Sequence, residues 1–214
     1  MALLLGHRWI RHPEKMASES LRRRSLEKLM PFDGFKSVLR SEFDRIQRYQ
    51  RPLSILVIDI DDYKKLSEHH GKEHSDRLIR EVAWIVFEST RGTDIIALSK
   101  TKFIILLPET IHDKAMLLAW RIRKLVETFP FDLEHLYKME ITISIGVASP
   151  NENTHQAYQL YALANRALQH AKRQKNTVFS FNQKEPETYD PIELSDARPR
   201  LKIVPGDKSD KRNR

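Results

Sequence analysis

The sequence predicts an α+β domain in which a mostly antiparallel sheet is flanked by helices. Short apolar runs rich in β-branched residues alternate with longer segments whose apolar residues recur every three or four positions. Two of the short runs, 95–98 and 103–107, lie only four residues apart, which is typical of an antiparallel hairpin. The 214 residues are enough for one domain with a complete core plus appendages.

The first predicted elements are helical. Residues 18–30 place three leucines among arginines in a short amphipathic pattern, and residues 31–34 break it with a proline and a glycine. A second helix is predicted over 35–49, where apolar residues share one face. Arg51 and Pro52 then lead into the first strand of the core.

That strand is the most apolar stretch of the chain. Five of the six residues from 53 to 58 are apolar and three are β-branched, which is typical of a strand buried on both faces. A short helical turn follows at 63–69, and Gly71 separates it from a strong amphipathic helix at 75–89.

The remaining elements complete a familiar order. Beyond the hairpin, which Pro108 closes, helices are predicted at 111–129 and 158–173 and strands at 140–148 and 177–181. Strand, helix, two hairpin strands, helix and strand is the ferredoxin-like order, an antiparallel-rich sheet with helices on one face.

Charge divides the chain into three segments. A basic, partly helical leader at 1–30 has seven basic against three acidic residues, and a polar tail at 182–214 has eight against seven. The formal net charge is +8, so the domain at 31–181, with its core at 51–181, is only weakly charged. We therefore expect no nucleic-acid fold there, and Arg22–Arg24 of the leader fit a solvated helix face as well as a nucleic-acid contact. The tail contains four prolines and is expected to be disordered.

Composition excludes other classes of protein. No apolar run is long enough to cross a bilayer, and the opening MALLLG is too short for the core of a signal peptide. Without cysteine there is no disulfide framework, thiol catalysis or cysteine metal site. These features predict a cytoplasmic protein with no membrane partner. The sequence leaves open whether translation starts at Met1 or Met16.

Three carboxylates follow the apolar strand. Asp59, Asp61 and Asp62 would put negative charge at one edge of the sheet, where carboxylates can hold a divalent metal or a metal-bound phosphate. The same residues would also suit the positive end of the next helix. The stretch by itself favours the second interpretation.

Longer motifs add a family resemblance. In order, the chain contains VIDIDDYKKL, RGTDIIA, FIILLPET, ITISIGVAS and YALANRALQHAK, and across 51–181 this series resembles the GGDEF family, the diguanylate cyclases. The resemblance implies a nucleotide-cyclase-like fold. In that family two GTP-bound domains meet and join their nucleotides into cyclic di-GMP.

The resemblance also implies roles for individual residues. Asp59 and the carbonyl of Ile60 fall on the family's Mg²⁺ ligands. Ser67 and Asp76 fall on its guanine-recognition residues. Lys172 falls on a phosphate-binding lysine, and Asn176 on a phosphate-binding arginine.

The chain departs from the family at the hairpin that gives the family its name. Ser99–Phe103 reads SKTKF instead of GGDEF, and the spacing from Asp94 to Phe103 is one residue shorter. Both glycines and both acids are missing, and a lone carboxylate with one carbonyl is a poor Mg²⁺ site. Ser67 cannot reproduce the paired donor and acceptor of an amide. We therefore expect no catalytic residues, no required cofactor, and Mg²⁺ only where the vestigial site still binds nucleotide.

A second motif lies away from the hairpin. Arg91 and Asp94 match the family's R-x-x-D, which in many members binds cyclic di-GMP as an inhibitory product. A helix exit followed by a strand start explains the same residues equally well, and no second arginine is identifiable from the sequence.

Other candidates are weaker. His69, His70 and His74 invite a metal interpretation, but Gly71 interrupts the helical alignment that their rings would need. Trp84 and Trp120 lie within predicted helices and are assigned to packing rather than stacking on a ligand.

The leading functional prediction is a degenerate GGDEF domain without cyclase activity. It would act in signalling by binding cyclic di-GMP, GTP or a protein partner, and a homodimer remains open. The first alternative is an active diguanylate cyclase, and the second is a basic nucleic-acid-associated protein, which only the leader favours.

Overall fold

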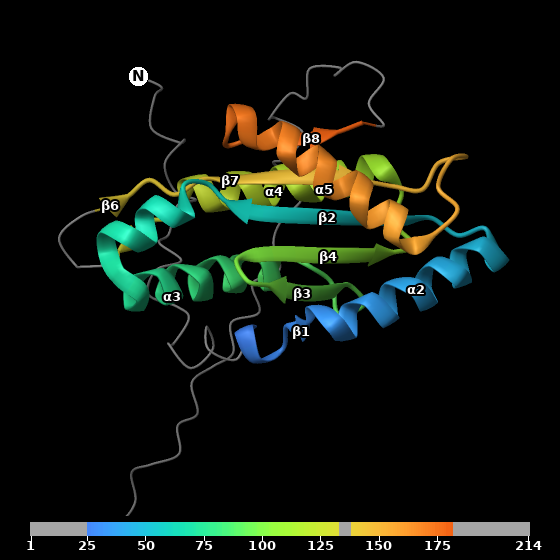
Figure 1. Cartoon of the computed structure of the whole chain (residues 1–214), viewed down its shortest axis with the longest axis horizontal. Helices are drawn as coiled ribbons and strands as arrows, with labels where there is room; N and C mark the ends of the chain where they lie inside the picture. The colour runs from blue at the N-terminus through green and yellow to red at the C-terminus, as the bar shows by residue number, and fades with distance from the viewer. Residues whose placement is uncertain (1–24, 133–137, 182–214) are drawn as a thin grey trace, which may run out of the picture.

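The structure is a computed structural model that describes residues 25–132 and 138–181 (Figure 1). The predicted tail and most of the predicted leader lie outside these residues. The named elements, in chain order, are β1 (Met30–Pro31), α2 (Phe32–Tyr49), β2 (Leu53–Ile60), α3 (Tyr63–Ser89), β3 (Ile95–Ser99), β4 (Lys102–Pro108), α4 (His112–Thr128), β5 (Phe131–Asp132), β6 (Lys138–Met139), β7 (Ile143–Ala148), α5 (Ala157–Gln174) and β8 (Val178–Ser180).

Six of the strands form one mixed sheet in the order β1-β3-β4-β2-β7-β8. The predicted buried strand β2 lies inside it and pairs antiparallel with both neighbours, so that Ile58 faces Phe103 of β4 and Ile145 of β7. The outer pairs β1–β3 and β7–β8 are parallel. The predicted α+β class is confirmed.

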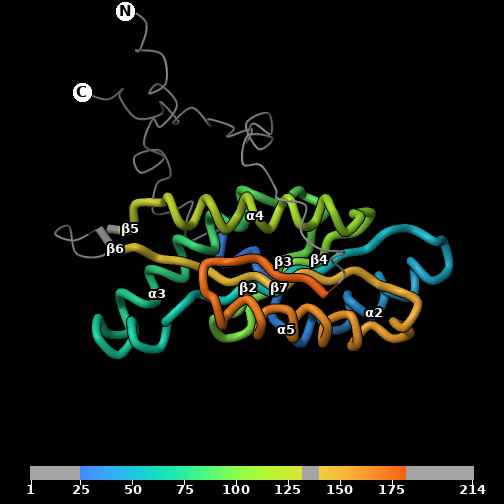
Figure 2. Tube along the Cα trace, turned by 90° about the horizontal axis from the view of Figure 1, so that it is seen from above, coloured from blue at the N-terminus to red at the C-terminus, as the bar shows by residue number. Residues whose placement is uncertain are grey.

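Helices cover both faces of this sheet (Figure 2). Helices α3 and α4 pack on one face, which receives Leu56, Ile58 and Ile60 of β2. Helices α2 and α5 pack on the other, which receives Ile55 and Val57. The predicted ferredoxin-like unit, from β2 to β7, has both of its helices, α3 and α4, on one face. Helices α2 and α5 lie outside that unit and cover the other face, because β2 is apolar on both of its sides.

The helix after β2 bends where the sequence predicted a break. Gly71 has φ 81° and ψ 174° inside α3, a left-handed φ that glycine adopts without a Cβ penalty. The two predicted helical segments therefore form one element with a kink. A second glycine, Gly146 of β7, permits close packing: an added Cβ would lie 2.1 Å from the carbonyl oxygen of Ala164 on α5.

The last described residues of the leader belong to the packed unit. Residues 25–27 are helical, and Leu26 and Leu29 pack against the α3–α4 side of the core. Met30 then pairs with Ala97 of β3. The sequence did not predict this two-residue strand, or the β5–β6 pair, because such short strands carry no measurable alternation.

No helix in the described part of the chain is long and apolar enough to cross a membrane.

Candidate functional site

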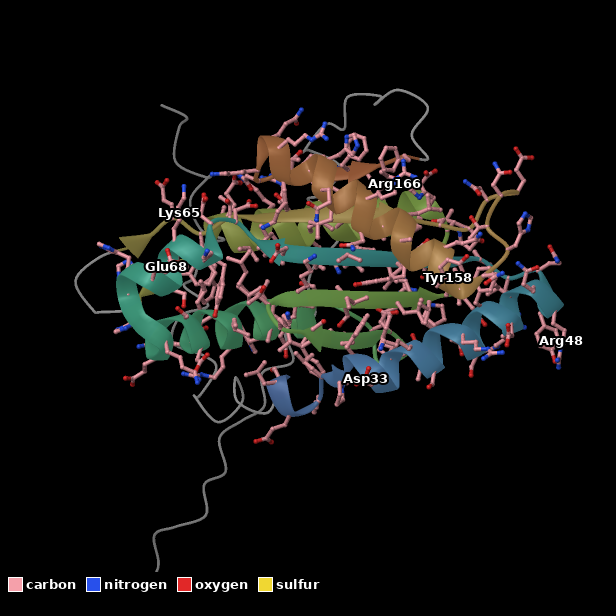
Figure 3. All side chains as sticks on the ribbon, in the orientation of Figure 1. Asp33, Arg48, Lys65, Glu68, Tyr158 and Arg166 are labelled. Carbon is pink, nitrogen blue, oxygen red and sulfur yellow. The ribbon has the colours of Figure 1, made fainter. Side chains whose placement is uncertain are left out.

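Three chain segments meet at the end of β2. This strand ends at Ile60, the β3–β4 hairpin turns at Lys100 and Thr101, and α5 ends at Gln174, all at the same side of the molecule (Figure 1). The antiparallel register places Lys102 directly opposite Asp59. Figure 3 shows Lys65, on the first turn of α3, on this side, and Arg48 and Tyr158 at the far side.

The Asp59 carboxylate is held by a lysine. Nζ of Lys172 lies 2.6 Å from Oδ2 of Asp59 and donates to the carbonyl oxygen of Ile60 at 3.1 Å. Thr101 of the hairpin donates to Oδ1 of Asp59 at 3.5 Å. The two oxygen atoms that the family resemblance assigned to Mg²⁺ are therefore both bound to one ammonium group.

Asp61 is buried and acts as a structural acceptor. Its carboxylate accepts hydrogen bonds from the hydroxyls of Thr142 and Ser144 at 2.9 and 2.8 Å, and from the backbone N–H of Asn176 at 2.9 Å. Its own N–H donates to the carbonyl of Thr142. This side chain joins the end of β2 to β7 and to the turn after α5.

Asp62 faces solvent. Nζ of Lys175 lies 2.6 Å from its Oδ2, and Nζ of Lys65 lies 3.7 Å from its Oδ1. The hydrogen bond from Lys175 lowers the pKa of the Asp62 carboxyl below its usual value. Asp62 is the N-cap residue of α3, so its charge lies at the positive end of that helix, as the second interpretation expects, although its side chain makes no cap hydrogen bond.

Asn176 is part of a network with α4. Its side-chain oxygen accepts a hydrogen bond from Arg123 at 2.8 Å, and its amide nitrogen donates to Glu127 at 2.7 Å. Hydrogen bonds from Lys124 and then Asn176 lower the pKa of Glu127 to about 2. From the sequence, Asn176 was predicted only to replace a phosphate-binding arginine, and no local pattern indicates that its side chain joins α4 to the turn after α5.

The hairpin turn has only two residues between its paired strands. Ser99 pairs with Lys102, and Lys100 in the turn adopts φ 57°, a left-handed conformation that favours glycine. Nζ of Lys102 donates to the side-chain oxygen of Asn165 at 3.4 Å. The hairpin thus carries two lysines and no carboxylate.

Ser67 and Asp76 lie on α3, on opposite sides of the Gly71 kink. Ser67 is half-buried, and Asp76 lies close enough to Tyr63 that its charge adds to burial in raising the pKa of that phenol. In the described part of the chain, neither side chain shares a hydrogen bond with the Asp59–Lys172 pair.

Asp59, Ile60 and Asp61 do not form a binding site that fits a divalent metal. Mg²⁺ prefers six oxygen ligands, several of them waters, around one or two carboxylates. Here the ammonium of Lys172 holds Asp59 and Ile60, and Asp61 is saturated by other donors. Among residues 25–132 and 138–181, no group of three or more His, Asp or Glu side chains could hold a metal ion. The histidines of α3 therefore form no such group, and Nδ1 of His74 is hydrogen-bonded to the carbonyl of His70.

The R-x-x-D turn lies at the other end of β3. The backbone N–H of Arg91 donates to Oδ2 of Asp94 at 2.7 Å, while the N–H of Asp94 donates to the carbonyl of Arg91. Burial raises the pKa of Asp94, and the hydrogen bond and charge of Arg91 oppose that shift. The Arg91 side chain itself is exposed.

A second arginine lies beside this turn. Nη2 of Arg121, on α4, donates to the carbonyl of Ser89, the last residue of α3, at 2.6 Å. Burial lowers the pKa of Arg121, and the charge of nearby Arg91 adds to the shift. Arg121 could not be found from the sequence, because the two arginines are thirty positions apart and only the packing of α4 on α3 brings them together.

A groove lies elsewhere on the described part of the chain. It has a volume of about 550 Å³, opens near the start of β2 between the end of α2 and the start of α4, and is lined in part by Arg51, Ile111 and His112. None of the predicted site residues lines it.

One family match covers both the end of β2 with its hairpin and the R-x-x-D turn. The family described as "Diguanylate cyclase, GGDEF domain" matches residues 29–177, which include the end of β2, the hairpin and the R-x-x-D turn. The chain belongs to the GGDEF domain family. Its match begins one residue before β1 and ends one residue before β8, so it spans the six-stranded sheet up to its last strand.

Curated GGDEF relatives are longer proteins. Diguanylate cyclase A of Treponema denticola is 38% identical over 124 residues, 56% of this chain and 33% of that protein. The uncharacterized protein YhcK of Bacillus subtilis is 31% identical over 132 residues, 61% of this chain and 37% of that protein. The chain thus spans about a third of the length of these relatives.

Solved GGDEF domains share the fold. The active GGEEF domain of a diguanylate cyclase from Vibrio cholerae is 28% identical, with a TM-score of 0.64, and the match covers 69% of this chain and 94% of that one. The GGDEF domain of DgcB from Caulobacter crescentus, solved in complex with c-di-GMP, is 20% identical with a TM-score of 0.67, covering 71% and 91%. At 20% identity, the likeness to the DgcB domain shows a shared fold and nothing more.

Proposed function

We propose that this GGDEF domain does not make cyclic di-GMP and instead binds it at the turn formed by Arg91 and Asp94. The observation that carries the first half is the hairpin opposite Asp59, which offers lysines in place of carboxylates. The Asp59 carboxylate and the Ile60 carbonyl are bound by the ammonium of Lys172, and no hairpin carboxylate lies beside them to complete a metal site. A cationic hairpin cannot complete a metal site or assist deprotonation of a ribose hydroxyl.

The second half rests on groups that the hairpin change leaves intact. The exposed Arg91 guanidinium, the half-buried Asp94 carboxylate and the neighbouring Arg121 lie beyond the far end of β3. A guanidinium offers two parallel donors to the O6 and N7 edge of guanine, and a carboxylate accepts hydrogen bonds from N–H groups. Five strand residues separate the turn from Lys100, roughly 16 Å at the usual rise per residue. Loss of the cyclase hairpin therefore does not remove this site.

Synthesis is tested by long incubation of the full chain with GTP and Mg²⁺ or Mn²⁺, followed by chromatography. We expect no cyclic di-GMP. Product that disappears in Asp59→Asn would establish the alternative, an active diguanylate cyclase. The Treponema relative, whose name states that activity, serves as the positive control.

Binding is tested by calorimetry with cyclic di-GMP. We expect heat of binding that Arg91→Ala removes and that Arg121→Ala weakens at least tenfold, since each lost charge-assisted contact costs about 1.5–3 kcal/mol. Arg40→Ala is the matched control, because Arg40 is exposed on α2 and contacts neither residue. If the wild-type chain produces no heat at high ligand concentration, the nucleotide proposal fails and a protein partner becomes the leading candidate.

A further inference from the structure

A hollow lies beside the first half of α5, at the side of the molecule away from the hairpin. It has a volume of about 370 Å³, and we call it the α5 hollow. Tyr158, Ala162 and Arg166, three exposed residues spaced four positions apart on the helix, line it together with Asn151 and Asn153 of the preceding loop. Figure 3 shows Tyr158 and Arg166 along α5 at the surface.

The chain leaves the sheet next to this hollow. Strand β8 runs parallel to β7, and its last residue, Ser180, pairs with Val147. The chain therefore reaches Phe181 where β7 ends and the loop to α5 begins. Cζ of Arg166 lies over the Phe181 ring, 5.2 Å from its centroid. A chain that continues in the direction of β8 runs beside the loop and enters the α5 hollow.

The hollow suits an acidic segment that also has apolar side chains. Tyr158 is 62% exposed and offers apolar surface, and Ala162 extends that surface along the helix. Arg166 is exposed, and within residues 25–132 and 138–181 it forms no ion pair with a carboxylate. The side-chain amide of Asn153 can donate to and accept from the backbone of an extended peptide.

The chain supplies such a segment shortly after β8. Residues 185–196, EPETYDPIELSD, lie outside the described residues and contain five acidic residues and no basic one. The larger apolar side chains of this segment are Tyr189, Ile192 and Leu194.

The connection is long enough for the segment to reach the hollow. Ile192 follows Phe181 by eleven positions, which can span up to about 36 Å when extended. Tyr158 and Arg166 are eight helical positions apart, about 12 Å. A short tether also holds the segment at an effective concentration of roughly millimolar, so that even a weak contact is populated.

We infer that residues 185–196 bind the α5 hollow of their own chain. Acidic side chains of the segment pair with Arg166, and its apolar side chains cover Tyr158 and Ala162. A segment that does not fold by itself can order on a surface that supplies apolar contacts and opposite charge. While it is bound, this surface of α5 is closed to a second copy or to another protein. The contact is separate from the Arg91 turn and does not rest on the proposed function.

The test uses the absence of cysteine, because one introduced thiol then takes one label. Ile192→Cys in the full chain carries a nitroxide spin label, and broadening of backbone amide NMR signals identifies the residues close to it. We expect strong broadening at 151–153 and 158–166. Signals around Lys114, exposed on α4 at the opposite face of the sheet, should be much less affected. Dilution should not change the pattern, because the contact is within one chain.

Substitutions of exposed residues locate the contact. Arg166→Glu should lower the ratio of bound to free segment about fivefold, because an exposed ion pair contributes up to about 1 kcal/mol. Tyr158→Ser should also lower it, through lost apolar contact. Lys114→Glu is the matched control and should leave the broadening unchanged. Far-ultraviolet circular dichroism confirms that each variant is folded, and cyclic di-GMP binding by Arg166→Glu should equal that of the wild type.

Three results would overturn the inference. The first is broadening at α5 no stronger than that around Lys114, and the second is broadening that Arg166→Glu leaves unchanged. The third is broadening that disappears on dilution, which would assign the α5 hollow to a second copy of the chain.

Discussion

Adjacent aspartates at the end of β2 have different structural roles. Asp61 is buried and is the acceptor for three donors, whereas the Asp62 side chain is 44% exposed and pairs with lysines at the surface. A buried acceptor that is removed leaves its donors without partners, while an exposed ion pair contributes little because water and salt screen it. The sequence places these residues one position apart, and only the structure separates their roles.

Asp61→Ala should therefore destabilise the fold much more than Asp62→Ala. We expect a loss of about 2–4 kcal/mol in the free energy of unfolding for Asp61→Ala, because the hydroxyls of Thr142 and Ser144 lose their acceptor. Asp62→Ala should change it by less than about 1 kcal/mol. Urea denaturation of the two variants measures both values. Equal losses would show that the Asp61 network does not stabilise the fold.

The low pKa of Glu127 predicts that the fold loses stability in acid. Its folded-state pKa of about 2 lies below the reference value of 4.5, so its stabilising contribution is fully present above about pH 4.5 and is lost as the pH falls toward 2. Because the side chain is 30% exposed, we expect about 1–2 kcal/mol rather than the full linkage value.

Glu127→Gln is the matched test of that contribution. The variant should be less stable than the wild type at pH 7 and should approach it at pH 3, where the wild-type carboxyl is partly protonated. Urea denaturation at the two pH values measures the convergence. A constant difference would mean that the carboxylate charge does not carry the effect.

At the scale of elements, most of the secondary structure could be predicted from apolar periodicity. The hairpin, the α3 break at Gly71 and the helices α4 and α5 were found within a few residues because their apolar positions are regular. Positions that depend on tertiary packing could not be predicted this way. Arg121 reaches the R-x-x-D turn only because α4 packs beside α3, and Arg123, two residues on, lies about 200° further around the helix and reaches Asn176 instead.

Grafting the sequence GGDEF onto residues 99–103 should not create a cyclase. Ser67 would still lack the paired donor and acceptor of an amide, and the side chain of Asn176 would still be held by Arg123 and Glu127. A glycine at position 100 suits the left-handed backbone there, so the graft should fold. Chromatography of products from GTP measures the outcome, with thermal unfolding as the control for folding. Turnover comparable to that of the Treponema relative would contradict this prediction.

At the scale of the whole molecule, the boundary of the folded unit is set by packing rather than by charge. The basic composition of the first 30 residues predicts a leader at 1–30. However, Leu26, Leu29 and the pairing of Met30 with Ala97 connect residues 25–30 to the core. The amphipathic pattern of residues 18–30 predicts a helix, but it does not indicate which element that helix packs against.

Two truncations test this boundary. A protein that begins at residue 25 should unfold at nearly the same temperature as the full chain. One that begins at residue 32 loses both leucines and β1, and its free energy of unfolding should fall by about 2–4 kcal/mol, the usual cost of removing one or two partly buried leucines. Thermal and urea denaturation measure the difference. Equal stability of the two truncated proteins would place residues 25–31 outside the core.

The brevity of β1 and β8 has a consequence for solubility. These are the two edge strands of the sheet, and they contain only two and three residues, one of them Pro31, which has no backbone N–H to donate. A long, flat edge would offer a row of free amides and carbonyls to the edge of another copy, and short or proline-containing edges limit such pairing. The highly apolar strands β2 and β4, which would aggregate readily at an edge, lie in the middle of the sheet between β3 and β7, away from both of these short edges.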